Sequence, residues 1–200
     1  MKCRKSCFII IFLLAALLAS GLYLTKKLMH PPDDSPIFTS AESMTSTPPY
    51  PPISELVGSL GQVLIVNTDP STSCGPKQLA FSVKQLEALP QTNFKTRHTW
   101  SSEAQEFSGP LLADVLNLVC PKARDIYLRS LDQYSVMVNF SKGSEFKPIL
   151  ALKVDGKPLT VREKGPIWVM VDADGLKIPE RSLDNMLVWQ LYYIRILSSD

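Results

Sequence analysis

The first 52 residues differ in composition from the rest of the chain, and this difference limits where a core can form. An apolar run spans residues 7–24, with basic residues before it and two lysines after it. Such a run is typical of a signal peptide or a membrane anchor, and its length is close to the roughly 20 residues of a spanning helix. We favour an uncleaved anchor within residues 1–28 over cleavage after Gly21, because apolar residues continue past that point. Either way, the remainder is expected in a periplasmic or other extracytoplasmic compartment, anchored to the inner membrane if the segment is retained.

Residues 29–52 predict a linker. Seven of the 16 prolines of the chain lie in residues 31–52, interleaved with serine and threonine. A segment of this composition stays extended and does not build a core. Residues 53–200 are left for one ordinary domain, which is long enough to bury a core.

The positive charge of the chain belongs to its N-terminal segment. The sequence has 21 Lys and Arg against 19 Asp and Glu, but residues 1–30 contain five of the cations and none of the anions. The remainder therefore has 16 cations against 19 anions, a net charge of −3. We expect no basic face that would bind nucleic acid.

Two of the four cysteines, Cys74 and Cys120, lie in the expected domain. Their spacing fits neither a Cys-x-x-Cys motif nor a zinc site. In an oxidising compartment they could form a disulfide, but the sequence does not supply the Cα separation that a bridge requires. Two buried free thiols remain an alternative, and a thiolate ligand to a metal is the least favoured one.

The rest of the sequence predicts an α+β domain with a mixed β-sheet. Ser82 and Gln85 form a capping box for a helix that continues to Leu89, and a second helix is expected from Leu111 to Val119. Strands are expected at 63–66, 93–100, 126–131, 135–140, 150–154, 166–171 and 190–197. The last of these is apolar on both faces, which indicates a central strand. Asp155 and Gly156 indicate a hairpin turn.

Four weak motifs occur in one order along these elements. They are the stretch 107–116 (FSGPLLADVL), the turn 132–135 (DQYS), the run 149–159 (ILALKVDGKPL), and Trp189 with the strand after it. Together they resemble the molybdopterin-binding oxidoreductase domain of the sulfite oxidase-like family, over about residues 79–197. The resemblance implies that family's mixed sheet and a molybdenum–pterin site.

Two departures from the family pattern bear on the chemistry. In the family, the strand that matches residues 93–100 delivers a cysteine thiolate to the metal, whereas this chain has Arg97, His98, Thr99 and Trp100 there. Near Lys164, the family shows a His-Gly pair and a later arginine, where this chain has Trp168. Carboxylate and imidazole replace a soft thiolate poorly, so molybdenum catalysis is not expected.

A set of cationic and aromatic residues remains as a candidate ligand site. Cations could bind a phosphate or carboxylate, and a tryptophan could supply a flat wall. The alternative is that the cations are solvated strand and loop residues and that the tryptophans belong to the core. We favour this alternative for His98 and Trp189. The candidate residues are Arg97, His98, Trp100, Arg162, Lys164 and Trp168.

Three hypotheses follow, and they leave open whether the protein is an enzyme. The leading one is an exported, membrane-tethered domain that binds an anionic small molecule or a membrane or periplasmic protein, without a cofactor, a metal ligand or a catalytic residue. The second is an active molybdopterin-dependent oxidoreductase with an atypical metal site. The third is a structural domain with no ligand.

Overall fold

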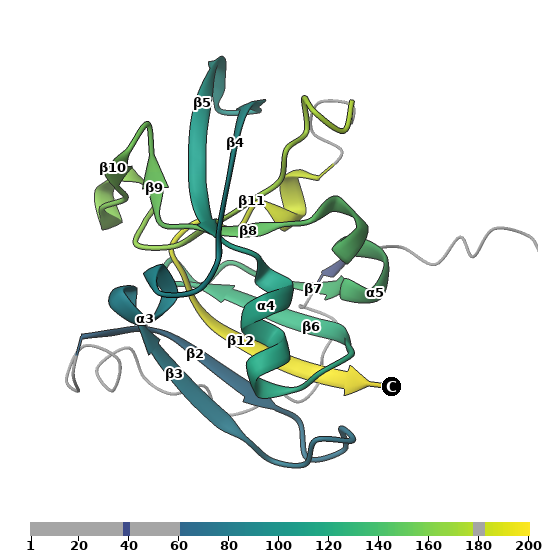
Figure 1. Ribbon diagram of the computed structural model, residues 1–200. Helices are drawn as coiled ribbons and strands as arrows, with labels where there is room; N and C mark the ends of the chain where they lie inside the picture. The colour runs from purple at the N-terminus through teal and green to yellow at the C-terminus, as the bar shows by residue number, and fades with distance from the viewer. Residues whose placement is uncertain (1–37, 41–60, 178–182) are drawn as a thin grey trace, which may run out of the picture. The chain divides into compact units, whose positions relative to one another are not determined.

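The computed structural model describes residues 38–40, 61–177 and 183–200, which form an α+β domain made mostly of strands. The α+β class expected from the sequence is confirmed. Its largest sheet has six strands, in the order β1-β7-β6-β12-β2-β3 (Figure 1). They are β1 (Phe38–Ser40), β7 (Ser135–Asn139), β6 (Ala123–Ser130), β12 (Leu191–Ser199), β2 (Gln62–Thr68) and β3 (Gln78–Ser82). β1 therefore comes from the segment predicted to be a linker, and it pairs with the edge of the sheet.

The central strand is β12, which runs parallel to β2 and antiparallel to β6. Its two faces pack into different apolar clusters. Ile194 belongs to the main core, whereas Tyr193 packs with Ile65 and Tyr127 on the other face. The prediction of a central strand with two apolar faces is confirmed.

Helix α4 (Leu112–Val119) covers one face of the six-stranded sheet (Figure 1). Its buried residues are spaced at helical intervals and form one stripe, which explains why this segment folds as a packed helix. They are Leu112, Val115, Leu116 and Val119. Leu111, expected inside the helix, is instead its extended N-cap residue. Expected boundaries shift in this way because a helix end depends on local hydrogen bonds rather than on apolar spacing.

The remaining helices are short. The predicted capping box is present, because Ser82 accepts from the Gln85 backbone and the Gln85 side chain accepts from the Ser82 backbone. It opens α3 (Val83–Glu87). Phe140 does not extend its strand as predicted but begins α5 (Phe140–Gly143), because the Asn139 side chain caps that turn. In the described residues that follow, there are three 3-10 helices, η2 (Ser144–Phe146), η3 (Val161–Glu163) and η4 (Asp184–Met186).

A second sheet extends away from the first and positions the site. Its order is β10-β9-β5-β4, and β4 and β5 form a long hairpin beside the short β9–β10 hairpin (Figure 1). Asp155 and Gly156 form the β9–β10 turn with φ of 49° and 75°, so the predicted hairpin is confirmed. The strands are β4 (Gln91–His98), β5 (Ser101–Pro110), β9 (Lys153–Val154) and β10 (Lys157–Pro158), and β8 (Ile149–Ala151) pairs separately with β11 (Trp168–Met170).

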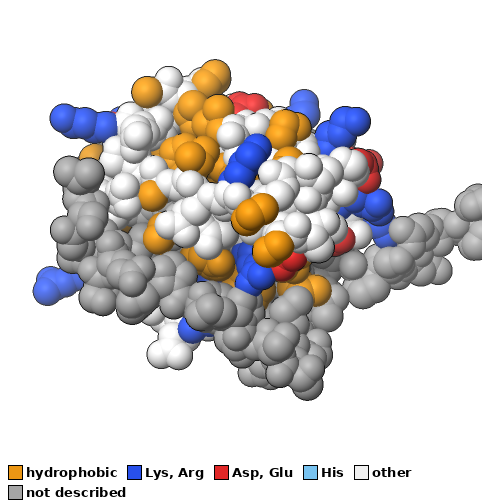
Figure 2. Space-filling model, turned by 90° about the horizontal axis from the view of Figure 1, so that it is seen from below, with side chains coloured by type: hydrophobic (Ala, Val, Ile, Leu, Met, Phe, Trp, Pro, Cys, Tyr) orange, Lys and Arg blue, Asp and Glu red, His pale blue; other side chains and the backbone are white. Residues whose placement is uncertain are grey.

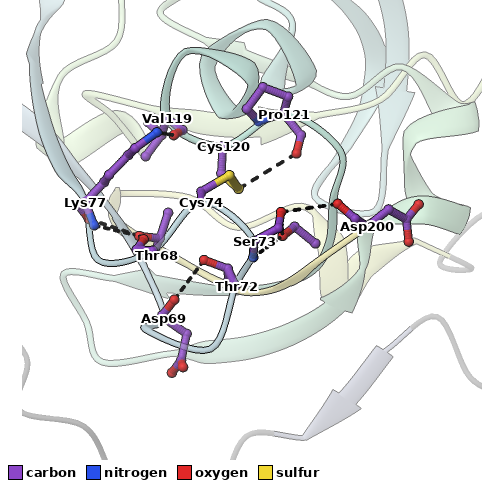
Figure 3. Close-up of a disulfide and its surroundings, with 12 residues drawn as sticks. Thr68, Asp69, Thr72, Ser73, Cys74, Lys77, Val119, Cys120, Pro121 and Asp200 are labelled. Carbon is purple, nitrogen blue, oxygen red and sulfur yellow. Dashed lines mark hydrogen bonds between the residues drawn. A yellow bond between two sulfur atoms is a disulfide. The ribbon is translucent and has the colours of Figure 1, made fainter.

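A disulfide joins Cys74 to Cys120, with 5.7 Å between their Cα atoms (Figure 3). It links the β2–β3 loop to the C-terminal end of α4. The same loop bonds to the chain terminus, because the Ser73 hydroxyl donates to the Asp200 carbonyl at 3.2 Å. The bridge thus ties together segments that are 46 residues apart. A bridged pair leaves no free thiolate at either cysteine.

The one face drawn in Figure 2 carries its charged side chains at several separate places. On the face drawn in Figure 2, Lys and Arg side chains are scattered among polar and apolar ones and form no continuous basic patch in the described part. Within the described ranges, no helix is long and apolar enough to cross a membrane. The predicted anchor in residues 1–28 and most of the predicted linker lie outside the residues that the structure describes.

Candidate functional site

Strand β4 brings His98 into the interior. Its side chains alternate between exposed and covered positions, and Thr96 and His98 are the two buried ones. His98 is 8% exposed and packs against the rings of Trp168 and Phe107, at 5.0 and 5.8 Å between centroids. The interpretation of His98 as a water-facing strand residue is wrong, because alternation along β4 turns it toward the core.

Both ring nitrogens of His98 are engaged. Nδ1 accepts the backbone N–H of Trp100 at 3.2 Å, which places the ring proton on Nε2, 3.0 Å from Oε1 of Gln105. Burial lowers the pKa of His98, and the charge of Lys164 acts in the same direction, while Gln105 and Asp184 oppose it. His98 is therefore a neutral residue that holds the β4–β5 turn in place.

We expect acid to destabilise the protein through His98. The unfolded chain binds the proton near pH 6.5, whereas the folded His98 has a lowered pKa, so the unfolded state gains protons first as the pH falls. This contribution is present above pH 6.5 and is lost progressively below it. Urea unfolding at pH 7.5 and 5.5 checks this: the loss of stability between the two should be smaller in His98→Gln than in the native chain. An equal loss in both proteins would contradict the assignment.

All three tryptophans of the chain meet at this place. Trp100 packs edge-on against Trp189 at 4.9 Å and lies 6.2 Å from Trp168. Two of the rings are fixed by their indole N–H groups, since Trp168 donates to the Leu187 carbonyl and Trp189 to the Asp132 carboxylate. Trp100 is 42% exposed and forms the outer wall. Trp189 is half-buried and packs against the main core, as the core interpretation expects, and its ring also contacts Trp100.

The ammonium of Lys164 lies among these three rings. Its Nζ is 4.3 Å from the ring centroid of Trp168, 4.8 Å from that of Trp100 and 5.4 Å from that of Trp189. Burial lowers the pKa of Lys164, whereas the ring faces attract the charged form and act against that shift. Among the described residues, no carboxylate or hydrogen-bond acceptor pairs with this ammonium. It is a partly buried cation without an anion.

The loop that carries Lys164 is fixed by hydrogen bonds rather than by the ammonium. The backbone of Lys164 adopts a left-handed conformation (φ 70°), and the Lys164 carbonyl accepts the backbone N–H of Gln190 at 2.8 Å. Gly165 follows, and a Cβ there would lie 2.5 Å from the Leu159 carbonyl oxygen, so only glycine fits. The Thr160 hydroxyl donates to the Glu163 carboxylate at 2.9 Å and closes the turn. A ligand would therefore meet Lys164 in a largely preformed position.

A cavity of about 350 Å³ opens beside this ammonium. The β4–β5 hairpin, the β9–β10 hairpin and the η3 loop enclose it, which brings together residues more than 60 positions apart. Its size is at the lower end for small-molecule sites. The side chains that line it are His98, Trp100, Gln105, Val154, Asp155, Lys157, Pro158, Leu159, Arg162, Glu163, Lys164 and Trp168.

Five of the six candidate residues line this cavity, and Arg97 does not. As the neighbour of His98 on β4, Arg97 points to the opposite face of the strand. There it forms a salt bridge with Asp174 at 2.9 Å, and its backbone N–H donates to the same carboxylate. Its expected place in the site is therefore corrected. Further lining residues were not predicted from the sequence, because only the packing of β5, the β9–β10 hairpin and η3 around the cavity brings them here. They include Gln105, Asp155, Lys157 and Glu163.

The donor atoms at this site do not fit a thiolate-bound molybdenum. The end of β4, where the sequence resemblance would place a metal-binding cysteine, has no cysteine among residues 97–100, and both ring nitrogens of His98 are engaged. Cys74 and Cys120 bond to each other and do not line the cavity. Across the described ranges, no group of three or more His, Cys, Asp or Glu residues is arranged to hold a metal ion. The residues present suit the binding of an organic ion better than metal coordination.

Comparison with known proteins supports the fold alone. No protein-family model and no curated protein matches the sequence. Among solved structures, the chain is similar to the sulfane dehydrogenase SoxCD from Paracoccus pantotrophus, with a TM-score of 0.51 and 18% sequence identity. The match covers 68% of this chain and 38% of that one, so this chain spans well under half of that protein's length. The fold thus has a distant structural resemblance to that of an oxidoreductase.

Proposed function

We propose that this protein is an extracytoplasmic binding module for a small organic anion, built on a fold like that of the molybdopterin-binding oxidoreductases but without their metal chemistry. The observation that supports this proposal is the position of the Lys164 ammonium, which lies at the cavity wall without an anionic partner among the described residues. A partly buried cation is stabilised by an opposite charge, and a ligand carboxylate or phosphate would supply it. Arg162 at the rim adds a second cation.

The tryptophan walls define what else the ligand carries. Trp100 presents a partly exposed ring at the cavity, and Trp168 lies behind Lys164. Flat apolar groups pack well against such rings, so an anion with an attached ring or chain gains contacts that an inorganic ion does not. A small carboxylate with an apolar body fits this combination of charge and surface.

Export of the module rests on the sequence of residues 1–28 and is supported by the disulfide. Disulfides persist in oxidising compartments and are rare in the cytosol. The bond between Cys74 and Cys120 is consistent with a domain that works outside the cytoplasm. A membrane or periplasmic protein partner remains part of this proposal, with the ligand as its signal.

The experiment is a titration of the full-length chain with 3-phenylpropanoate, followed by intrinsic fluorescence and calorimetry. Because all three tryptophans surround Lys164, the fluorescence reports on this site. We expect saturable binding, and a Kd raised about tenfold or more in Lys164→Met, since a hydrogen bond to a charged group contributes about 1.5–3 kcal/mol. Lys95→Met, which removes an exposed lysine of β4, is the matched control and should bind as the native chain does. Absence of binding, or equal binding by Lys164→Met, would overturn the proposal.

A second candidate function is an active molybdopterin-dependent oxidoreductase with an atypical metal site. The observation that favours it is the structural likeness to a sulfane dehydrogenase. The donor atoms around the cavity do not favour a molybdenum site, because no free thiolate is available among the described residues. Metal analysis separates the two candidates.

A further inference from the structure

Five charged side chains line the cavity, and they are of both signs. Lys157, Arg162 and Lys164 are cationic, and Asp155 and Glu163 are anionic. None of the five forms an ion pair with any described residue, although they share one small cavity. The cavity therefore offers unpaired charges of both signs to whatever enters it.

The two carboxylates are held in position by neutral donors. Oδ1 of Asp155 accepts the backbone N–H of Glu106 at 3.0 Å, which fixes it at the β9–β10 turn. Oε2 of Glu163 accepts the Thr160 hydroxyl at 2.9 Å. Each carboxylate keeps acceptor capacity, because an ionised carboxyl group can accept several hydrogen bonds. The two belong to different segments that flank the cavity, the β9–β10 hairpin and η3.

A purely anionic ligand would pair with the cations of the cavity but not with its carboxylates. Its charge would pair with Lys164 and Arg162, but Asp155 and Glu163 would repel it. A ligand that carries an ammonium as well as a carboxylate turns that repulsion into attraction. The ammonium of Lys164 already lies among the three tryptophan rings. The ligand's ammonium is therefore expected at the carboxylates and not at these rings.

We propose that the ligand is a small zwitterion of the amino-acid type, with its carboxylate at Lys164 and Arg162 and its ammonium at Asp155 and Glu163. The proposal rests on the anion-binding function above and specifies its ligand class. A side group of moderate size, packed against Trp100, is compatible with a cavity of about 350 Å³. No covalent step is involved.

The test compares two matched pairs of probes on the full-length chain: phenylalanine with 3-phenylpropanoate, and alanine with propanoate. Each pair differs only in the ammonium group. We expect the zwitterion of each pair to bind about fivefold more tightly than its anion, since two partly exposed ion pairs each contribute modestly. Binding is followed by tryptophan fluorescence and calorimetry.

The combined variant Asp155→Asn with Glu163→Gln should change the affinity for zwitterions and the affinity for anions in opposite directions. Both amides keep the oxygen that accepts the present hydrogen bonds, so the turns stay intact. The zwitterions should bind about fivefold more weakly to this variant, and the anions more tightly. Glu145→Gln removes an exposed carboxylate outside the cavity and should change neither.

The outcomes separate this inference from the proposed function. If the anions bind at Lys164 with the same affinity as the zwitterions, the zwitterion inference fails and the anion-binding function stands. If the double variant weakens both members of a pair equally, the inference also fails, because the carboxylates then act only on the structure. If no probe binds the native chain, both proposals fail.

Discussion

Replacing Gly109 with alanine is expected to lower the free energy of unfolding by about 3 kcal/mol or more, the upper range for overpacking. Gly109 lies in β5, and a Cβ built on it would lie 1.9 Å from the Leu150 carbonyl oxygen and 2.6 Å from its carbon. These are backbone atoms of β8, so no side chain can rotate away to make room. The methyl group would force the two strands apart where the second sheet meets the core.

Urea unfolding measures this effect, and Ser108→Ala is the matched control. Ser108 is the neighbouring residue of the same strand, and its partly buried side chain has no hydrogen bond to any described residue. Its replacement should change the free energy of unfolding by less than about 0.5 kcal/mol. If Gly109→Ala unfolded at the same urea concentration as the native chain, the close approach of β5 and β8 would be wrong. Phe107, which supports His98 from β5, makes this approach relevant to the site.

Removal of the disulfide by Cys74→Ala with Cys120→Ala is expected to lower the free energy of unfolding by about 4 kcal/mol. The bond closes a loop of 46 residues, and the entropy that such a loop removes from the unfolded chain gives this magnitude. Cys120 is also completely buried, so the variant loses some packing. The expected effect is large because loop closure acts on the unfolded chain, whatever hydrogen bonds hold the β2–β3 loop in the folded state.

Reduction supplies the control for this prediction. A reducing agent should lower the stability of the native chain to about that of the double variant and should leave the double variant unchanged. If reduction had no effect on the native chain, the bond would be absent in solution. If both proteins were equally stable when oxidised, the loop-closure argument would be wrong.

The elements that the sequence predicted well are those that local chemistry determines. The capping box at Ser82 and Gln85 and the turn at Asp155 and Gly156 depend on residues next to each other in the chain, and both are present. The central position of β12 follows from apolar residues on both faces, which is a property of one short segment. The helix and strand ends were predicted less well. Leu111 stays extended and forms an isolated bridge with Ile149, which comes from a distant segment. The Asn139 side chain caps the turn that begins at Phe140.

The site was predicted only in part because its geometry is tertiary. Residues near 98 and 164 meet at one cavity, and Trp189 packs beside them against Trp100. These residues are far apart in the sequence, and no periodic pattern connects them. The alternation along β4 could have separated Arg97 from His98, since neighbours on a strand face opposite sides. Nothing in the sequence indicates that Lys164 lies among three tryptophan rings, because that depends on how the η3 loop packs against the β4–β5 hairpin.

The fold and the site together give a consistent physical account. The fold has a distant structural resemblance to that of a sulfane dehydrogenase. At the end of β4, this chain has a neutral His98 with both ring nitrogens hydrogen-bonded, beside an aromatic cluster around the Lys164 ammonium. This arrangement is the basis of our proposal that the cavity recognises an organic ion by charge and by flat apolar contact.

The most direct test of binding without metal chemistry is to measure the molybdenum and pterin content of the full-length chain, purified from a host that makes the cofactor. Elemental analysis gives the metal, and fluorescence of the oxidised extract gives the pterin. The account predicts neither above the level of a matched purification without the protein. One molybdenum atom per chain, retained through purification together with pterin, would contradict it.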